Sequence, residues 1–371
     1  MMKTIKIQFS NGDDMDIYLK SHLLTHPVLQ PQDAVKFCYQ SAFGGGHLIT
    51  DPLRATEYLA KERASLTPSS AIPLTEPLGG GLVRLNLASP DAVSLSDAAI
   101  LRIFAASAEH VLSREDNDAR FSALLTMLET LTADHGAPFS AEALDAYLQN
   151  YRAQGCPMVS HTEEYRTAYA PSYRVIEEKY IPLLPLIGRI DTLLTKNQTR
   201  TTVIAIDGHA ASGKTTCAAI LAELFDCSVF HMDDFFLPFE KRTEERLAEA
   251  GGNVDYERFY DEVLTPILAG KPVTYAAFDC SSGTLLPPLT TEPNPLVIIE
   301  GSYSHHPYFG DAYDLRAAID ITEDEQRARI LKRNGERMLA MFVSRWIPME
   351  HRYFETYSIF EHADLVLGST R

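Results

Sequence analysis

The sequence is short of cysteine, of positive charge and of long apolar runs, and each shortage excludes a class of protein. Its five cysteines are scattered and form no CxxC pair, so neither a disulfide framework nor a zinc cluster is expected from them. Lys and Arg number 33 against 50 Asp and Glu, and the formal charge of −17 would repel nucleic-acid backbones and anionic membrane surfaces. Small molecules are therefore the expected partners.

Export and membrane insertion are not indicated either. No stretch approaches the roughly 20 apolar residues of a spanning helix, and residues 1–14 hold no apolar run of signal-peptide length. We therefore expect a cytoplasmic protein without a membrane partner. With 371 residues, of which 45% are hydrophobic and 22% charged, the chain is typical of a soluble globular protein with two domains. The oligomeric state is left open, a homo-oligomer included.

What the sequence does contain is a glycine-bounded loop between a buried strand and a helix. Residues 203–206 read Val-Ile-Ala-Ile, which is typical of a parallel strand, and residues 208–215 then read GHAASGKT. Glycines in such a loop let successive backbone N–H groups turn inward around an anion, and the helix that follows adds the positive end of its dipole. An ordinary glycine turn is the alternative, but the strand before and the Ala/Leu-rich helix at 217–224 favour phosphate binding.

This loop predicts how a nucleoside triphosphate such as ATP is held. Lys214 is expected to reach the β- and γ-phosphates, and the Thr215 hydroxyl is expected to ligate the accompanying Mg²⁺. ATP and Mg²⁺ are therefore the expected cofactors. The predicted nucleotide-binding residues are Gly208, Ala211, Ser212, Gly213, Lys214, Thr215 and Thr216.

Acidic residues follow two further apolar strands, which are expected at 228–232 and 296–299. Asp233 and Asp234 come directly after the first strand, and Glu300 comes after the second. Ligands bind beyond the carboxyl ends of parallel strands, so we expect Asp233 to accept a proton from an attacking hydroxyl or to help hold Mg²⁺. Glu300 is the expected Mg²⁺ partner at the second strand end. One of the two aspartates is expected to cap the next helix.

Two later segments add polar groups. Asp255 stands at the N-cap position of a predicted helix, where capping and a substrate contact are both open. Thr322 and Glu325 form a capping box. The helix that this box opens carries the basic residues Arg327, Arg329, Lys332, Arg333 and Arg337. Such a run is usually a solvated helix face, but here it suits a lid whose guanidinium groups stabilise a transferring phosphoryl group.

The second half of the chain is predicted to be a three-layer α/β domain. Five strands are expected near residues 203, 228, 297, 318 and 365, with helices between them, in a parallel sheet of the P-loop NTPase type. Residues 181–194 predict a connecting helix. We therefore place the domain boundary at 180/181, with residues 1–180 as one domain and 181–371 as the other.

Residues 1–180 are predicted to be a helix-rich α+β domain to which the sequence assigns no function. Alternating polarity at 3–9 and 15–19, around Asn11-Gly12, predicts a β-hairpin. Helical spacing is found at 32–43 and from 96 to 151, with a break at 136–138, and 82–87 reads as a strand. Glycine triplets at 44–46 and 79–81 are expected to be turns, with close approach to a ligand as the alternative.

Polar and aromatic side chains of this half carry weaker signals. His47, which follows the first glycine triplet, and His161 are each expected to be isolated surface histidines, with a shared site as the alternative. Tyr165, Tyr169 and Tyr173 lie four residues apart, so on a helix they would share one face. A stripe of this kind is more typical of a core or an interface than of a stacking platform.

Together, four spaced motifs resemble the uridine kinase, nicotinamide riboside kinase and phosphoribulokinase group of phosphate-loop kinases. The motifs are GHAASGKTT, HMDDFF, NVDYERF and VIIEG, with the arginine-rich segment after them, and they cover roughly the second half of the chain. The resemblance implies an ATP- and Mg²⁺-dependent kinase. It also implies that Asp233 is the general base and that Asp255 binds ribose hydroxyls. Glu300 would then be the Mg²⁺ partner, and Arg329 and Arg333 the lid arginines.

The chain departs from uridine kinases at the base-binding hairpin, where those enzymes carry an aromatic residue and a histidine. Here Tyr275, Phe278, Asp279 and Cys280 stand in that region, without a histidine. We expect a nucleoside-like acceptor that Tyr275 helps to bind, and the first alternative is a kinase of a sugar phosphate or a non-nucleoside alcohol. The second is a nucleotide-dependent switch with residues 1–180 as the effector. A GTPase is disfavoured because the sequence lacks an Asn-Lys-x-Asp segment.

Overall fold

The chain divides into two compact units at Ile181 and Pro182. The computed structural model describes residues 15–45, 51–134 and 136–368. The described residues up to Ile181 are called the N-terminal unit, and those from Pro182 onward the C-terminal unit. Within these ranges, no helix is both long and apolar enough to cross a lipid bilayer.

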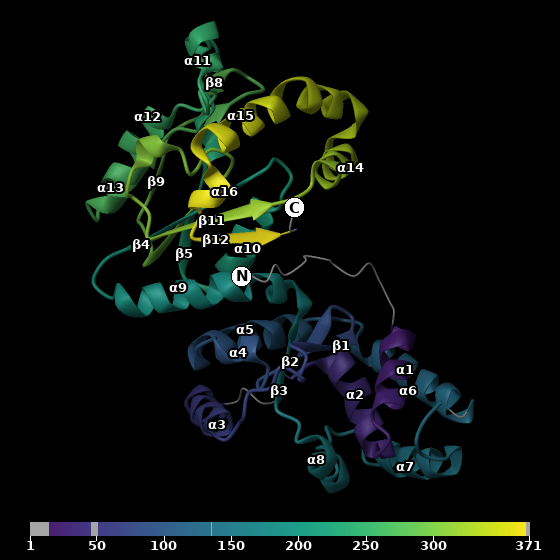
Figure 1. Ribbon diagram of the computed structural model, residues 1–371. Helices are drawn as coiled ribbons and strands as arrows, with labels where there is room; N and C mark the ends of the chain where they lie inside the picture. Colours follow the sequence, from purple (N-terminus) through teal and green to yellow (C-terminus); the bar gives the residue numbers. More distant parts are fainter. Residues whose placement is uncertain (1–14, 46–50, 135, 369–371) are drawn as a thin grey trace. The chain divides into compact units, whose positions relative to one another are not determined.

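The C-terminal unit is built on a parallel five-stranded sheet with the strand order β12-β11-β4-β10-β5 (Figure 1). Both β4 and β10 are buried along their whole length, which explains their nearly continuous apolar sequences. The predicted α/β sheet of the P-loop type is thus confirmed, with all five strands at the expected positions. The strands are β4 (Thr202–Gly208), β5 (Cys227–His231), β10 (Leu296–Glu300), β11 (Leu315–Asp320) and β12 (Leu365–Gly368).

Helices and small antiparallel pairs connect these strands. Strand β6 (Val273–Tyr275) pairs with β9 (Leu289–Thr291), and β7 (Phe278–Asp279) pairs with β8 (Thr284–Leu285). The helix α14 begins where the sequence predicts, because the Thr322 hydroxyl accepts the backbone N–H of Glu325. The helices are α9 (Leu184–Lys196), α10 (Lys214–Leu224), α11 (Glu244–Ala248), α12 (Tyr256–Phe259), α13 (Thr265–Leu268), α14 (Glu323–Met341), α15 (Ile347–Tyr357) and α16 (Ile359–His362).

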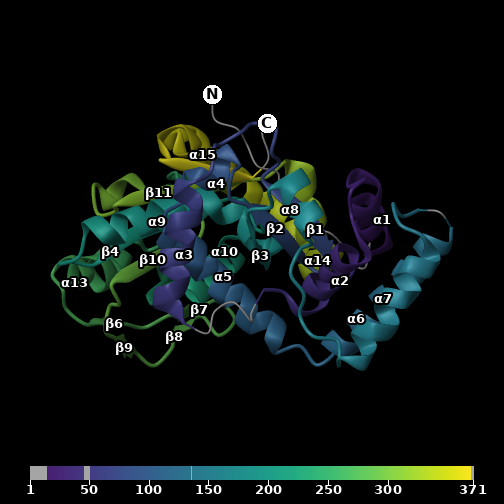
Figure 2. The ribbon, with the colours of Figure 1, turned by 90° about the horizontal axis from the view of Figure 1, so that it is seen from below.

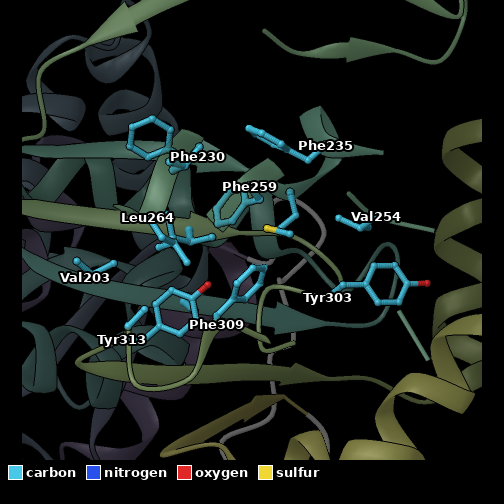
Figure 3. Close-up of a cluster of buried hydrophobic side chains, with 14 of the residues drawn as sticks. Val203, Phe230, Phe235, Val254, Phe259, Leu264, Tyr303, Phe309 and Tyr313 are labelled. Atoms are coloured by element: carbon cyan, nitrogen blue, oxygen red, sulfur yellow. The ribbon is translucent and has the colours of Figure 1, made fainter. Parts of the chain in front are cut away.

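An aromatic core packs against one side of this sheet (Figure 3). Phe235 meets Phe259 edge to face at 5.0 Å between ring centroids, and Phe259 lies 5.4 Å from Phe309. Burying a side chain of this size contributes about 1.5–3 kcal/mol to stability. Because Phe235 is the last residue of the turn Met232–Phe235, this packing fixes the position of Asp233 at the end of β5.

The N-terminal unit combines a small antiparallel sheet, in the order β1-β2-β3, with eight helices among its described residues. The expected helix-rich α+β fold is therefore confirmed. Helices α6 and α7 lie side by side in both views of the ribbon (Figures 1 and 2). The elements are α1 (Met15–Thr25), α2 (Pro31–Phe43), α3 (Pro52–Ala64), β1 (Thr75–Gly79), β2 (Leu82–Asn86), α4 (Pro90–Val93), α5 (Asp97–Leu112), α6 (Asn117–Ala133), α7 (Ala141–Ala153), α8 (Glu163–Tyr169) and β3 (Tyr173–Glu177).

The strand predicted at residues 15–19 is wrong, because these residues begin helix α1. Leu19, His22 and Leu23 are buried and recur at spacings of three and four, so the core-facing stripe is helical. The alternation over residues 15–19 was too short to separate the two periods. The partner strand at residues 3–9 and the turn Asn11-Gly12 lie outside the described residues.

The glycine triplets have different outcomes. Gly79, Gly80 and Gly81 all have positive φ, between 62° and 81°, and form the turn between β1 and β2 as predicted. Gly44 follows the end of α2, also with a positive φ. Gly46 and His47 lie outside the described residues.

Candidate active site

The loop between β4 and α10 is shaped to surround an anion. Gly208, Ala211 and Gly213 have φ of 144°, 60° and 105°. A Cβ on Gly208 would lie 2.3 Å from the Ile319 carbonyl oxygen, so only glycine fits there, whereas a Cβ on Gly213 would meet open space. The buried Ser212 hydroxyl has no hydrogen-bond partner among the described residues. A phosphate oxygen in this concavity would satisfy it.

Lys214, the first residue of α10, is folded back onto the loop. Its Nζ donates to the carbonyl oxygens of Gly208 and His209, both at 2.8 Å, and to the Ser302 hydroxyl at 3.3 Å. The side chain is buried. Because little water screens this ammonium group, it would attract a phosphate strongly.

Thr215, Glu300 and His231 meet beside the loop. The Thr215 hydroxyl donates to Glu300 Oε1 over 3.0 Å, and His231 Nδ1 lies 2.6 Å from the same oxygen. The strand register brings these groups together, because Glu300 pairs with Ile206 of β4 and with His231 of β5. The hydrogen bond to Glu300 raises the pKa of His231. A hydroxyl and a carboxylate are hard oxygen ligands, so this donor set fits Mg²⁺.

Asp233 stands at the tip of the neighbouring strand, in the turn Met232–Phe235. Part of its side chain is open to solvent. Loss of hydration in the surrounding protein raises the pKa of its carboxyl group above the ordinary value; Glu300 raises it further, and Lys214 opposes the shift. A carboxylate with a raised pKa is the stronger proton acceptor near neutral pH, which suits a general base.

Asp234 has a different role from the helix cap expected for one of the two aspartates. That expectation is wrong, because β5 leads into a 3-10 turn in which neither carboxylate caps the helix start. Asp234 Oδ2 accepts a hydrogen bond from the Tyr275 hydroxyl at 2.9 Å. The Tyr275 ring also stacks on Phe235, with 5.1 Å between centroids. Tyr275, the last residue of β6, therefore packs against the turn that follows β5.

Asp255 caps helix α12, as the capping alternative predicted. Its Oδ1 atom accepts a hydrogen bond from the Arg258 backbone N–H at 3.3 Å, and its Oδ2 atom forms an ion pair with Lys241 Nζ at 2.9 Å. The side chain is buried. A substrate contact would therefore have to compete with Lys241 for the Oδ2 atom.

The two expected lid arginines are placed differently. Arg329 Nη1 donates to the loop carbonyls of Ala211 and Ser212, at 3.2 and 3.0 Å. Arg333 is exposed on the same helix, and its Nε donates to the side chain of Asn334 at 2.7 Å. The structure thus brings Arg329 to the phosphate loop and leaves Arg333 on the outer part of α14.

Sequence reasoning missed Glu350, which lies on α15 and contacts the loop. Its two carboxylate oxygens accept the Ala210 backbone N–H, both at 3.1 Å, and it also accepts from the Ser302 hydroxyl at 3.1 Å and the Gln326 amide at 3.0 Å. Burial raises the pKa of this carboxyl group, and Lys214 opposes the shift. One buried carboxylate therefore joins α14, α15 and the loop.

Asp207 was missed as well, although it directly precedes the loop. It is fully buried, and its oxygens accept the backbone N–H groups of Gly208 at 2.6 Å and His305 at 2.9 Å, together with the Tyr353 hydroxyl at 2.8 Å. This residue ties the start of the loop to the segment after β10 and to α15. Its position in the sequence, an acidic residue directly after the apolar run 203–206, could have indicated that Asp207 is important for the loop.

Replacing Glu350 tests this support of the loop. Glu350→Ala should lower the free energy of unfolding of the C-terminal unit by about 3 kcal/mol, because the Ala210 backbone N–H and the buried Gln326 amide lose their acceptor. Glu350→Gln, which keeps an acceptor oxygen, should cost less. Trp346 is the sole tryptophan and lies one turn before Glu350, so its fluorescence during urea unfolding reports on this unit. Equal stability of Glu350→Ala and wild type would contradict the role.

The N-terminal unit contains a buried polar chain of its own. His161 Nδ1 lies 3.0 Å from Asp33 Oδ1, and its Nε2 lies 2.6 Å from the Tyr173 hydroxyl. Gln40 Oε1 receives a 3.3 Å hydrogen bond from Tyr173 and two further ones from Arg84, at 3.0 and 2.8 Å. The expectation that His161 is an isolated surface residue is therefore wrong: the ring is only 8% exposed, because Asp33 on α2 pairs with it.

The three tyrosines spaced by four do not form one helical stripe. Tyr165 and Tyr169 lie on α8, but Tyr173 begins strand β3. The left-handed Ala170, with a φ of 42°, ends the helix between them. The Tyr165 ring stacks on His161 at 4.1 Å between centroids, so this side chain belongs to the core.

The pH dependence of folding tests this chain. Burial lowers the pKa of His161 from 6.5 to about 4, with Arg84 and Lys36 contributing and Asp33 opposing. Between pH 6.5 and pH 4, His161 is therefore protonated in the unfolded chain but neutral in the folded chain. The free energy of unfolding is highest above pH 6.5 and decreases as the pH falls toward 4. At pH 5 His161 should account for a loss of about 2 kcal/mol. His22, whose pKa burial also lowers to about 4, adds to the pH dependence of the same unit. Urea unfolding followed by circular dichroism at pH 7 and pH 5 measures the total loss, and His161→Gln should reduce it by about the amount due to His161. An equal loss in His161→Gln and wild type would contradict the assignment.

The solved structures similar to this protein cover about half of the chain. No protein-family model and no curated protein matches the chain. A solved structure from Bacillus stearothermophilus, described as a possible uridine kinase, is 23% identical over 49% of this chain and 99% of its own, with a TM-score of 0.37. A candidate fructose transport system kinase from Silicibacter sp. TM1040 is 22% identical over 46% of this chain and 91% of its own, with a TM-score of 0.37.

The sheet order and the site define the class of the C-terminal unit. The loop follows the central strand β4, and the acidic tips of β10 and β5 lie beside it. The C-terminal unit therefore has a kinase-like fold of the phosphate-loop type, as the motifs implied.

Proposed function

We propose that the protein is an ATP- and Mg²⁺-dependent kinase that phosphorylates a hydroxyl group of a small, nucleoside-like molecule. The observation that carries the proposal is the convergence of Lys214, Thr215 and Glu300 at the mouth of an anion-binding loop. Asp233 supplies a carboxylate at the next strand tip. Such a site can hold a triphosphate at one end and an attacking hydroxyl at the other.

Each side chain has a defined task in this reaction. Lys214 exchanges its loop carbonyls for phosphate oxygens, and Asp233 accepts the proton of the acceptor hydroxyl as its oxygen bonds to the γ-phosphorus. The bond to the β–γ bridging oxygen breaks, and ADP leaves. Mg²⁺, held by Thr215 and Glu300, with Asp233 as a third candidate ligand, would neutralise charge on the phosphates. Arg329 is placed to add positive charge at the loop.

Asp255 and Tyr275 are proposed to bind the acceptor. Both lie on segments that contact the strand tip carrying Asp233: the Asp255 backbone N–H donates to the Phe235 carbonyl at 2.8 Å, and the Tyr275 hydroxyl donates to Asp234. Hydroxyl groups of a ribose would compete with Lys241 for the Asp255 carboxylate. A ribose contact at Asp255 is also what the resemblance to nucleoside kinases implies.

A sugar phosphate is the second candidate acceptor, because cations gather at the same end of the site. Arg258 Nη2 donates to the Asp234 carbonyl at 3.1 Å, and its guanidinium group lies 4.5 Å from the Phe235 ring centroid. Its buried Nε has no hydrogen-bond partner among the described residues. Together with Lys241 on Asp255, this arrangement suits an acceptor that carries an anionic group.

An acceptor screen with the full chain tests the proposal. Formation of ADP from Mg·ATP is measured with nucleosides, sugars, sugar phosphates and polyols in turn. The proposal expects ADP release that depends on one class of acceptor, with nucleosides first. Activity confined to sugar phosphates would select the second candidate. ATP hydrolysis that is indifferent to every acceptor would favour a nucleotide-dependent switch, with the N-terminal unit as effector, over a kinase.

A further inference from the structure

Two histidines and a glutamate meet in the N-terminal unit next to the polar chain around His161, and Arg84 joins the two groups because it donates to both Glu76 and Gln40. His22 and His26 lie one turn apart on α1, and Glu76 lies on β1. Each offers a possible metal-ligand atom, and these atoms all lie within 4.8 Å of one another. Histidines at positions i and i+4 share one face of a helix, which is a common geometry for zinc ligands.

His26 is held in the tautomer that a metal requires. Its Nδ1 lies 3.0 Å from the His22 backbone carbonyl oxygen, so this nitrogen carries the proton. The Nε2 atom is therefore left with its lone pair. A ring N–H bonded to a backbone carbonyl is the usual support for a metal-binding histidine. The side chain is half-buried, so an ion can reach it from solvent.

His22 is buried beside Glu76. The residue is 2% exposed, and its ring stacks on Phe37 at 4.5 Å between centroids. Its Nδ1 lies 2.6 Å from Glu76 Oε1, so an ion bound by these two atoms would replace their hydrogen bond. Nε2, on the opposite edge of the ring, has no hydrogen-bond partner among the described residues.

Glu76 is oriented by a second contact. Its Oε2 accepts a hydrogen bond from Arg84 Nη1 at 2.9 Å, which turns Oε1 toward His22. An outer partner of this kind fixes a ligating carboxylate. Arg84 also brings a buried positive charge near the cluster, and this charge opposes a dication. We therefore expect micromolar rather than nanomolar affinity.

We propose that His22, His26 and Glu76 bind one Zn²⁺ ion in the N-terminal unit. Two imidazoles and a carboxylate suit zinc rather than Mg²⁺ or Ca²⁺, which prefer oxygen ligands alone. Three protein ligands leave a fourth position for water, as in zinc sites that carry chemistry. The ion would also join α1 to β1, two elements that are adjacent in the fold but 50 residues apart in sequence.

Zinc titration of the full chain, without nucleotide or Mg²⁺, tests the proposal. Equilibrium dialysis against micromolar Zn²⁺ should load one ion that His26→Ala loses, with affinity lowered at least ~10-fold. The matched control is His110→Ala, which removes another histidine bonded to a glutamate, Glu177 at 2.7 Å, and should leave zinc binding unchanged. Circular dichroism of each variant establishes that it is folded, and His26→Gln replaces His26→Ala if the latter is not.

The results separate the outcomes clearly. Co²⁺ in place of Zn²⁺ should give the visible absorption of a four-coordinate site in wild type and in His110→Ala, and lose it in His26→Ala. The proposal is overturned if wild type takes up no zinc at tens of micromolar. Equal zinc affinity of folded His26→Ala and wild type overturns it too. These readouts do not involve phosphoryl transfer, so they are independent of the proposed kinase activity.

Discussion

Replacing Lys214 by alanine is expected to lower kcat/KM for ATP-dependent phosphoryl transfer by roughly 10²–10³-fold or more, the cost of removing one preorganised donor to a transition-state oxygen. In the structure the ammonium group is buried and bonded to two loop carbonyls and Ser302. It can therefore move to a phosphate without first being stripped of water. Initial rates of ADP formation with a saturating acceptor measure the effect.

Lys196→Ala is the matched control for this variant. Lys196 is exposed at the end of α9, and its removal should leave kcat/KM unchanged. The thermal midpoint of Lys214→Ala should be recorded as well, because the loop carbonyls lose their donor. A folded Lys214→Ala protein with wild-type activity would mean that the loop does not bind the transferred phosphate.

Asp233→Asn should reduce kcat by about 10²–10⁴-fold, the usual contribution of a general base. The amide keeps the shape of the side chain but cannot accept the proton of the acceptor hydroxyl. Asp234→Asn is the matched control, since its amide oxygen can still accept the Tyr275 hydroxyl and its neighbour keeps the carboxylate. Steady-state rates for the two variants should therefore differ widely.

The pH profile separates a base from a merely structural carboxylate. Since the surrounding protein raises the pKa of Asp233, wild-type kcat should fall on the acidic side at a pH above the ordinary aspartate range. The residual activity of Asp233→Asn should lack that limb. A loss of less than tenfold in Asp233→Asn, with the acidic limb intact, would remove Asp233 from the chemistry.

The sheet and the loop could be predicted because their signals are local. Buried parallel strands such as β4 and β10 are continuous apolar runs, and the residues at their ends, including Glu300, face the loop by topology alone. The glycines of the loop indicate positions where the backbone leaves no room for a side chain. At Gly208, for example, a Cβ would lie 2.3 Å from the Ile319 carbonyl oxygen. Local sequence was therefore sufficient to place these elements.

Contacts between distant segments could not be predicted in this way. Glu350 lies 140 residues from Ala210, and nothing in the spacing of α15 marks it as a partner of the loop. In the N-terminal unit, Asp33 and His161 are 128 residues apart, so His161 looked isolated in the sequence. The short alternating stretch at residues 15–19 failed for another reason, because a helix buries Leu19 and Leu23 on one face.

The central claim is that the C-terminal unit transfers the γ-phosphoryl group of ATP to an alcohol. Phosphorus NMR of the full chain with Mg·ATP and the best acceptor from the screen tests this most directly. The account predicts a new phosphomonoester resonance that grows in step with ADP and is absent with Lys214→Ala. Inorganic phosphate as the sole new product, or ATP that stays unchanged with every class of acceptor, would contradict it.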